Sequence, residues 1–252
     1  MDGRLFNLIL FGGLAIMIGL ELRARSFRVG SFQKNARAIR NWSFLGGAIA
    51  SAWILRLIST ELERHLTPLF DWQQYTALNL IACFLIADLI GWILHWVKHK
   101  NAWLWRFHFP HHRESTFDVW LVSHTHPLEV VAAGTMMSAI LILLGFSPLS
   151  INLYFLFYGL VNTYQHSAFS YSLGWLDYII AGPAYHRLHH AVWSDTNFGD
   201  TLTVWDVVFR TATWPKPDQR IEVGIDGPEP YGFAAEMTYF LEPDAVPDTS
   251  ES

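Results

Sequence analysis

The sequence predicts an all-α fold, in the form of an integral membrane helical bundle with about four or five membrane-embedded helices. Charged residues make up only 15% of the 252 residues and hydrophobic ones 52%, whereas a soluble domain averages about 25% charged residues. The chain also has 12 tryptophans, a residue that favours the membrane interface. Apolar segments of about spanning length recur along the chain, and they place the helices.

Five apolar segments are candidates for membrane-embedded helices, namely residues 5–20, 42–58, 72–96, 130–144 and 151–161. Three arginines, and no small-x-small cleavage site, follow the first segment, so we expect an uncleaved anchor. The second and third segments carry one charged residue each, Arg56 and Asp88. A turn with Pro148 joins the last two segments. We expect these two to form a helical hairpin that either crosses the membrane or dips into it.

Histidine dominates the polar part of the chain. Eight of the 12 histidines fall into three clusters, His95-x3-His99, His108-x2-His111-His112 and His186-x2-His189-His190, and His166 is a ninth candidate. Residues three or four apart share a helix face, so each cluster can present two imidazoles to one ion. Any one of these histidines alone is best explained as an interface residue. Three clusters together indicate a metal centre, and because a zinc ion takes about four ligands, nine imidazoles indicate two metals.

Charge counting places the clusters relative to the membrane. Loop 23–41 holds six basic residues and no acidic one, whereas loop 60–71 holds one arginine against three acidic residues. Basic residues collect in cytoplasmic loops, so we expect loop 23–41 to be cytoplasmic. The third span then delivers His95 to that side, and the 128–166 hairpin returns His166 to it. The full prediction is a bundle with a cytoplasmic, histidine-rich di-metal cap.

Composition suggests three regions: membrane anchor helices at 1–70, a catalytic region at 71–214 and an acidic tail at 215–252. The tail holds nine acidic and two basic residues. The only cysteine, Cys83, excludes an intramolecular disulfide and a cysteine-ligated iron–sulfur cluster. No nucleic-acid-binding signature is present, so we expect no nucleic acid partner.

Acidic residues near the clusters are candidate supports for the metal ligands. Asp88 precedes His95 by two helical turns on the same face, and a carboxylate there either orients a ligand or pairs with another polar side chain. Further acidic residues close to the clusters in sequence are Asp118, Glu129, Asp195, Asp200 and Asp206. None of them forms the Glu-x-x-His motif of soluble di-iron bundles, which disfavours that class.

The ordered set of motifs from residue 88 to 211 resembles the fatty acid hydroxylase superfamily, which includes sterol desaturases, methylsterol oxidases and alkylglycerol monooxygenase. The motifs are Asp88-x6-His95-x3-His99, His108-x2-His111-His112, His126-Pro127-x-Glu129, Asn162-x3-His166, His186-x2-His189-His190, Asn197-Phe198-Gly199 and Leu202-x2-Trp205-Asp206. A single HxxHH motif would be weak support, but the ordered set is specific.

The resemblance implies a di-iron centre that activates dioxygen and attacks a C–H bond of a lipid or sterol-like substrate. The catalytic iron ligands that it implies are His95, His99, His108, His111, His112, His166, His186, His189 and His190. The positions expected to support them are Asp88, His126, Asn162, Asn197 and Asp206. Asn162 stands where some members have another histidine, so it is a weaker ligand candidate.

The chain has no fused haem or flavin domain and no Gly-x-Gly-x-x-Gly fingerprint, so we expect an external electron donor, a separate reductase, ferredoxin or cytochrome. A basic surface around Arg106 and Arg113 is a candidate docking site for that donor. Desaturation remains open beside hydroxylation, because both begin with hydrogen abstraction. A non-catalytic membrane metal-binding or transport protein and a zinc hydrolase are also compatible with clustered histidines.

Overall fold

The computed structural model describes residues 31–72, 74–168, 173–192, 194–216, 219, 221–225 and 232–241, together with a few isolated positions before residue 31. For residues 31–38 it describes the backbone alone. The predicted first span at 5–20 lies outside the continuously described residues.

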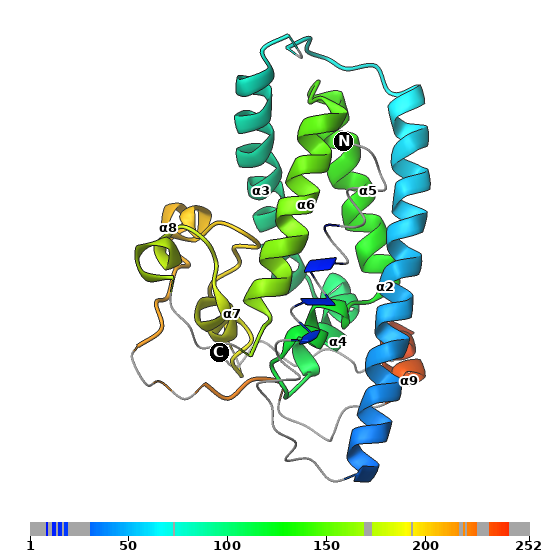
Figure 1. The fold of residues 1–252 in the computed structure, drawn as a ribbon, viewed down its shortest axis with the longest axis vertical. Helices are drawn as coiled ribbons and strands as arrows, with labels where there is room; N and C mark the ends of the chain where they lie inside the picture. The colour runs from blue at the N-terminus through cyan, green and yellow to red at the C-terminus, as the bar shows by residue number, and fades with distance from the viewer. Residues whose placement is uncertain are drawn as a thin grey trace.

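Four long helices lie side by side along the long axis: α2 (Ser31–His65), α3 (Thr76–Lys100), α5 (Pro127–Leu143) and α6 (Pro148–Gln165) (Figure 1). The short elements are α4 (Ala102–Arg113), η1 (Val119–Ser123), η2 (Gly174–Tyr178), α7 (Pro183–His189), α8 (Val204–Phe209), α9 (Phe233–Thr238) and η3 (Tyr239–Leu241). Two isolated β-bridges are the only strand pairing within the described ranges. The all-α prediction is therefore confirmed.

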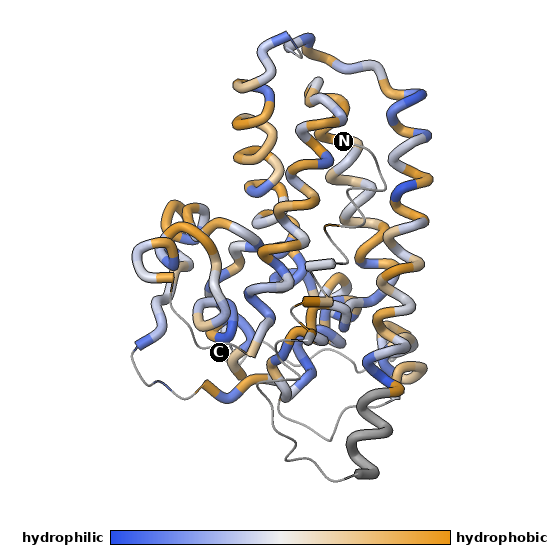
Figure 2. The backbone as a smooth tube through the Cα atoms, viewed as in Figure 1, coloured by the Kyte–Doolittle hydropathy of each residue, from blue (hydrophilic) through white to orange (hydrophobic). Residues whose placement is uncertain are grey.

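Two helices are long and apolar enough to cross a membrane, Ile39–His65 and Thr76–Lys100, and they contain most of the predicted spans 42–58 and 72–96. Pro127–Leu143 is apolar but shorter. The hydropathy colouring shows apolar residues along α3, α5 and α6 (Figure 2). These two helices support the prediction that the chain is a membrane protein. The total of four or five membrane-embedded helices stays a prediction.

The predicted hairpin forms between α5 and α6. Gly145 takes a positive φ of 81° in the turn, and a Cβ there would collide with the Phe70 carbonyl. The buried Asn79 of α3 binds both sides of this turn: its Nδ2 donates to the Gly145 carbonyl at 3.2 Å, and its Oδ1 accepts from the Ser147 amide at 3.0 Å. The hairpin is thus fixed to α3 at the end far from the histidines.

Helices α3 and α4 meet at Asn101, which ends the first helix and begins the second. Its backbone is extended, and its side-chain oxygen accepts hydrogen bonds from the amides of Trp103 and Leu104 at 3.0 Å. Such a cap satisfies amides that have no partner inside the helix. The sharp junction brings the last turn of α3 against α4, and the two helices carry five of the nine candidate histidines.

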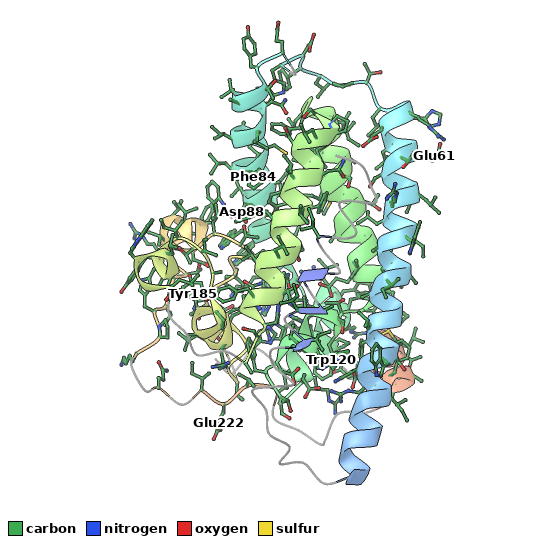
Figure 3. The ribbon with its side chains drawn as sticks, viewed as in Figure 1. Glu61, Phe84, Asp88, Trp120, Tyr185 and Glu222 are labelled. Atoms are coloured by element: carbon green, nitrogen blue, oxygen red, sulfur yellow. The ribbon has the colours of Figure 1, made fainter. Side chains whose placement is uncertain are left out.

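Most of the short helices gather toward one end of the bundle (Figure 1). Figure 3 places Glu61 near one end, and Trp120 and Glu222 near the other, where the short helices gather. Part of the predicted acidic tail packs there, because Phe233 of α9 contacts Phe44 of α2 edge-on at 5.1 Å and Glu236 is buried. Arg40 of α2 pairs with Glu236 at 3.6 Å.

Candidate metal centre

All nine candidate histidines converge at one end of the bundle, from α3, α4, α7 and the end of α6. They form two groups, within each of which the ligand atoms lie within 4.8 Å of one another. The first group is His95, His99, His108, His112 and His189, and the second is His111, His166, His186 and His190. Each of the HxxHH clusters contributes to both groups.

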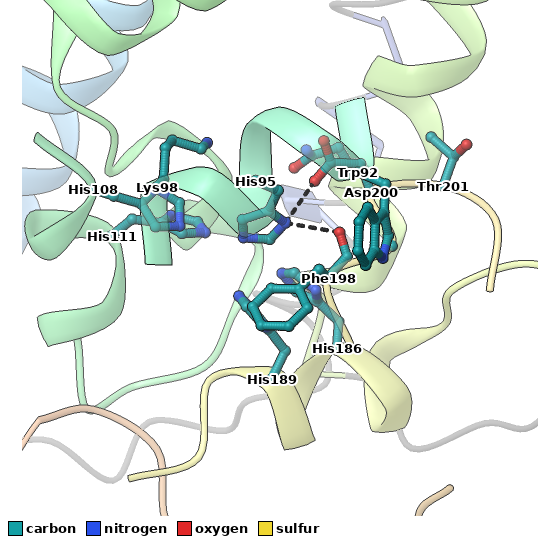
Figure 4. Close-up of polar contacts among 12 residues, drawn as sticks. Trp92, His95, Lys98, His108, His111, His186, His189, Phe198, Asp200 and Thr201 are labelled. Carbon is teal, nitrogen blue, oxygen red and sulfur yellow. Dashed lines mark hydrogen bonds and ion pairs between the residues drawn. The ribbon is translucent and has the colours of Figure 1, made fainter. Parts of the chain in front are cut away.

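In the first group, three imidazoles are held through Nδ1. His95 Nδ1 lies 3.0 Å from both the Phe198 carbonyl and Asp200 Oδ1 (Figure 4). His108 Nδ1 lies 2.9 Å from Glu129 Oε1, and His189 Nδ1 lies 2.9 Å from the Thr196 carbonyl. Because each partner is an oxygen acceptor, each Nδ1 carries the proton, and each Nε2 presents a lone pair.

In the second group, the Nε2 atoms face one another. His166 Nε2 lies 3.2 Å from His111 Nε2 and 3.0 Å from His186 Nε2, and His190 Nε2 lies 3.2 Å from His186 Nε2. His166 Nδ1 donates to the Asn162 carbonyl at 2.8 Å, so its Nε2 also presents a lone pair. Nitrogens in adjacent positions around an ion with bonds of about 2.1 Å lie roughly 3.0–3.4 Å apart. The observed spacing therefore fits metal coordination.

Several of these nitrogens have no protein partner. His95 Nε2, His99 Nε2 and His108 Nε2 are buried without a hydrogen bond, within the part of the chain that the structure describes. A buried polar atom without a partner costs about 1–3 kcal/mol. Three such atoms side by side, all presented by imidazoles, match the ligand set of a cation better than a packing arrangement.

Burial and neighbouring charges lower the pKa of several histidines of the two groups. Burial, and then the neighbouring imidazoles and Lys98, lower the pKa of His108 well below its usual value, and burial followed by nearby histidines does the same for His111 and His112. Burial also lowers the pKa values of His186, His189 and His190. A neutral imidazole is the form that binds a metal, so the site is prepared for ligation without losing protons.

Asp206 organises the loop that holds His95. The carboxylate is fully buried and accepts hydrogen bonds from the Phe198 and Gly199 amides at 2.8 Å. It accepts three further bonds, from Trp92 Nε1, the Tyr185 hydroxyl and Thr211 Oγ1. Because the Phe198 carbonyl faces His95, Asp206 acts on the histidine through the loop backbone.

Asp88 and Asn197 fix the same region without touching a histidine in any described contact. Asp88 accepts from Thr201 Oγ1 and, at 3.0 Å, from Trp205 Nε1. Asn197 has a positive φ of 61°, and its Nδ2 donates to the Tyr185 and Thr213 carbonyls at 3.0 and 2.8 Å. Both residues therefore pin the segment around Phe198 to the rest of the fold.

His126 and Asn162 have different surroundings from each other. His126 begins α5, where its Nδ1 accepts from the Leu128 amide at 3.1 Å, and its Nε2 lies 3.2 Å from the Met237 carbonyl. Its two nitrogens are thus engaged away from both histidine groups. Asn162 supports His166 with its backbone carbonyl.

The structure corrects the expected docking surface around Arg106 and Arg113. Arg113 is buried, and its guanidinium lies 5.2 Å from the centre of the Phe109 ring. Arg106 is half-buried and donates to the Phe240 carbonyl at 3.3 Å. Because both guanidinium groups pack into the fold, they do not form an open basic face.

Two supporting carboxylates were not singled out by the sequence, Glu129 on His108 and Asp200 on His95. Lys98 Nζ also donates to Glu129 Oε1 at 2.6 Å. A motif signal existed for each, since Glu129 follows the His126-Pro127 pair and Asp200 follows Asn197-Phe198-Gly199. Proximity in sequence could not separate them from Asp118 or Asp195.

The region that carries the histidines also matches a known protein family. The family model described as fatty acid hydroxylase matches residues 80–211, which include all nine histidines. The chain is 29% identical over 174 residues to ornithine lipid hydroxylase OlsE of Rhizobium tropici, covering 66% of this chain and 51% of that protein.

Two relatives from Homo sapiens are also similar. Alkylglycerol monooxygenase is 22% identical over 197 residues, covering 74% of this chain and 43% of the relative. Cholesterol 25-hydroxylase is 26% identical over 149 residues, covering 54% and 53%. The chain spans about half the length of these relatives. No solved structure matches. Because the fatty acid hydroxylase model matches just over half of this chain, the chain belongs to the fatty acid hydroxylase family.

Proposed function

We propose that this protein is a membrane-embedded di-iron oxygenase that hydroxylates a C–H bond of a lipid or sterol-like substrate with dioxygen. The observation that carries the proposal is the pair of buried imidazole groups at one end of an apolar helical bundle. The family membership supports it, because the relatives named above are hydroxylases or monooxygenases whose names include ornithine lipid, alkylglycerol and cholesterol.

Iron fits the donor set better than zinc. All nine candidate ligands are imidazoles, which suit iron as well as zinc, copper and nickel. A structural zinc takes about four ligands and a catalytic zinc about three, whereas the first group alone offers five. We propose that each group holds one iron, with His95, His99, His108, His112 and His189 on one and His111, His166, His186 and His190 on the other.

The residues of this chain prepare the site. The oxygen acceptors on His95, His108, His166 and His189 fix the tautomer and the orientation of each ring. Burial keeps bulk water from the rings and lowers the pKa of His108, His166 and His189. When bound, two irons would supply the activation of dioxygen and the oxidising power needed to break an unactivated C–H bond.

Hydroxylation is preferred over desaturation because the relatives named above carry hydroxylase or monooxygenase names. One oxygen atom enters the substrate and the other leaves as water, which consumes electrons and protons. A separate reductase, ferredoxin or cytochrome is proposed as the donor. Because Arg106 and Arg113 pack into the fold, we do not propose them as the docking site of this donor.

We further propose that the histidine end of the bundle faces the cytoplasm. The predicted basic loop is in part helical, because Lys34, Arg37 and Arg40 belong to the first turns of α2, and this end of α2 lies at the histidine end of the bundle. The regions 1–70, 71–214 and 215–252 remain the proposed anchor, catalytic unit and tail. A thiol-labelling experiment in oriented vesicles tests the orientation: a cysteine at Glu222 should react from the cytoplasmic side only, and one at Glu61 from the opposite side only.

The first test of the proposed function is metal content. Protein purified in detergent and loaded with iron without oxygen should bind about two irons per chain, with Mössbauer spectra of a coupled pair, as two groups of ligands require. Lipid substrates are then supplied with isotopically labelled dioxygen and a reductase, and the label should appear in a hydroxylated product. The substitutions His111→Ala and His189→Ala should remove metal and activity.

The matched control is His65→Ala, since that ring is exposed and lies in the last turn of α2. It should leave both metal content and turnover unchanged. One zinc per chain, or normal turnover by either ligand variant, would refute the proposal.

A further inference from the structure

Two short segments form a strongly apolar surface beside the bundle. Residues 173–179, which contain η2, and residues 203–209, which contain α8, are together called the lip. Eight of their apolar or aromatic side chains are 42–70% exposed. These are Leu173, Trp175, Tyr178, Ile179, Val204, Val207, Val208 and Phe209. A contiguous exposed patch of this kind marks an interaction surface.

Backbone contacts join the two segments into one surface. The Thr203 amide donates to the Ile179 carbonyl at 3.0 Å, and Thr203 Oγ1 donates to the Tyr178 carbonyl at 2.7 Å. The adjacent residues Ile180 and Leu202 form an isolated antiparallel bridge. The exposed side chains therefore belong to a single fixed feature.

Both acidic side chains of the lip, Asp177 and Asp206, are engaged in hydrogen bonds within the fold. Asp177 accepts the Leu173 amide at 3.0 and 3.1 Å, which uses its carboxylate inside the segment. Asp206 is fully buried. The first charged side chain after α8 is the exposed Arg210, at the edge of the lip, where an arginine can extend to a polar boundary.

The lip is docked onto α3 well inside the candidate span. Trp205 Nε1 donates to Asp88 Oδ2 at 3.0 Å, and the Phe209 ring stacks on Trp92 at 4.3 Å. At 1.5 Å per residue, Asp88 lies about 18 Å along the axis from the last residue of α3, Lys100, and Trp92 lies about 12 Å from it. Figure 1 shows α8 beside α3 and not beyond its end.

The outer surface of α3 continues the apolar surface of the lip. Ile81, Leu85 and Ile93 are 41–60% exposed on a helix that is long and apolar enough to cross a membrane. An exposed apolar surface at the depth of a span meets hydrocarbon. We propose that the lip is embedded in the bilayer beside α3, where its exposed side chains contact lipid acyl chains.

This placement links the membrane to the histidines. Asp206, on the buried side of α8, accepts the amides of Phe198 and Gly199, and the Phe198 carbonyl faces His95. The proposal itself is independent of metal binding and of oxidation, so it can be tested on the protein without metal.

Spin labelling tests the location of the lip. The only cysteine, Cys83, is buried, so Cys83→Ala provides a background for single cysteines at Val208 and Trp175. Each labelled protein is placed in phosphatidylcholine nanodiscs, and collision rates are measured with oxygen, which concentrates in hydrocarbon, and with a water-soluble nickel chelate. The ratio of oxygen to chelate collisions should be several-fold higher at both positions than at the control, Glu222→Cys, where the native side chain is charged and exposed.

Val207→Cys, also exposed on α8, replaces either variant that fails to retain the wild-type melting temperature. A water-like ratio at the lip, equal to that of the Glu222 control, would overturn the proposal. Protection from both collision partners would also overturn it, because the lip would then be covered by protein, such as a second copy of this chain.

Discussion

Among the described residues, carboxylates contact two histidines of the group of five and none of the group of four. Asp200 and Glu129 contact His95 and His108, both in the group of five. In the group of four, His166 has a backbone carbonyl, and the Nδ1 atoms of His111, His186 and His190 have no hydrogen-bond partner among the described residues. A carboxylate makes an imidazole more basic and holds its orientation, so the two groups should differ in metal affinity.

The first prediction concerns these carboxylates. Asp200→Asn and Glu129→Gln should each weaken binding to the five-histidine group about 10- to 100-fold, as is typical for partners of metal ligands. Competition titration of the metal-free protein with zinc or cobalt measures this. Asp195→Asn is the control, because the same change falls in the same loop on an exposed carboxylate that pairs with Lys100. Equal affinities in all three variants and the wild type would contradict the prediction.

The second prediction concerns Gly91, one turn before His95. A Cβ at this position would lie 3.1 Å from Asp200 Oδ2 and 3.5 Å from the Tyr154 hydroxyl. Gly91→Ala should therefore displace Asp200 and lower the affinity of the same group in that titration. Gly46→Ala in α2 meets no atom within 4 Å, so it should keep metal affinity and gain up to about 1 kcal/mol of stability from helix propensity. Identical metal affinities for the two variants would refute this role of Gly91.

At the scale of helices, the α3–α4 junction sets the distance between His99 and the histidines of α4. The third prediction is that Asn101→Ala, which removes the cap on Trp103 and Leu104, costs about 1 kcal/mol. The melting temperature in detergent should fall and metal content should fall with it. Asn101→Ser restores a capping oxygen and should recover most of both. If the serine variant behaves like the alanine variant, capping is not the reason.

The sequence predicted the helical class, the hairpin and the clustering of nine histidines, and two of its five apolar segments lie in helices long enough to span a membrane, because apolar length and i, i+4 spacing are local signals. The sequence did not determine which two imidazoles of each HxxHH cluster belong to the same ligand group. In the structure, His108 joins His112 and His186 joins His190, both four residues apart, while His111 and His189 point to the other group. That exchange depends on how α4 and α7 are placed relative to each other, and the contacts of Asp200 and Glu129 depend on how their own segments pack against α3 and α4. Long-range packing of this kind has no local signature.

At the scale of the whole molecule, the fold gathers nine imidazoles at one end of an apolar bundle, and most of them are buried. Those with strongly lowered pKa values stay neutral in the folded protein below pH 6.5, whereas in the unfolded chain they take up protons there. Below about pH 6.5 the unfolded state therefore binds more protons, and folding is destabilised as the pH falls. Each such imidazole contributes up to about 1.4 kcal/mol per pH unit, and the effect vanishes above that pH.

The fourth prediction follows for the metal-free protein. Its melting temperature in detergent should be constant at neutral and mildly alkaline pH and should fall steeply between about pH 6.5 and pH 5, because several imidazoles titrate together. His111→Gln removes one of them and should make the decline shallower, whereas His65→Gln, on an exposed ring, should leave it unchanged. With metal bound, the decline should move to lower pH, since protons then compete with the ion for the same nitrogens. A flat profile for the metal-free protein would mean that these rings are not buried together in solution.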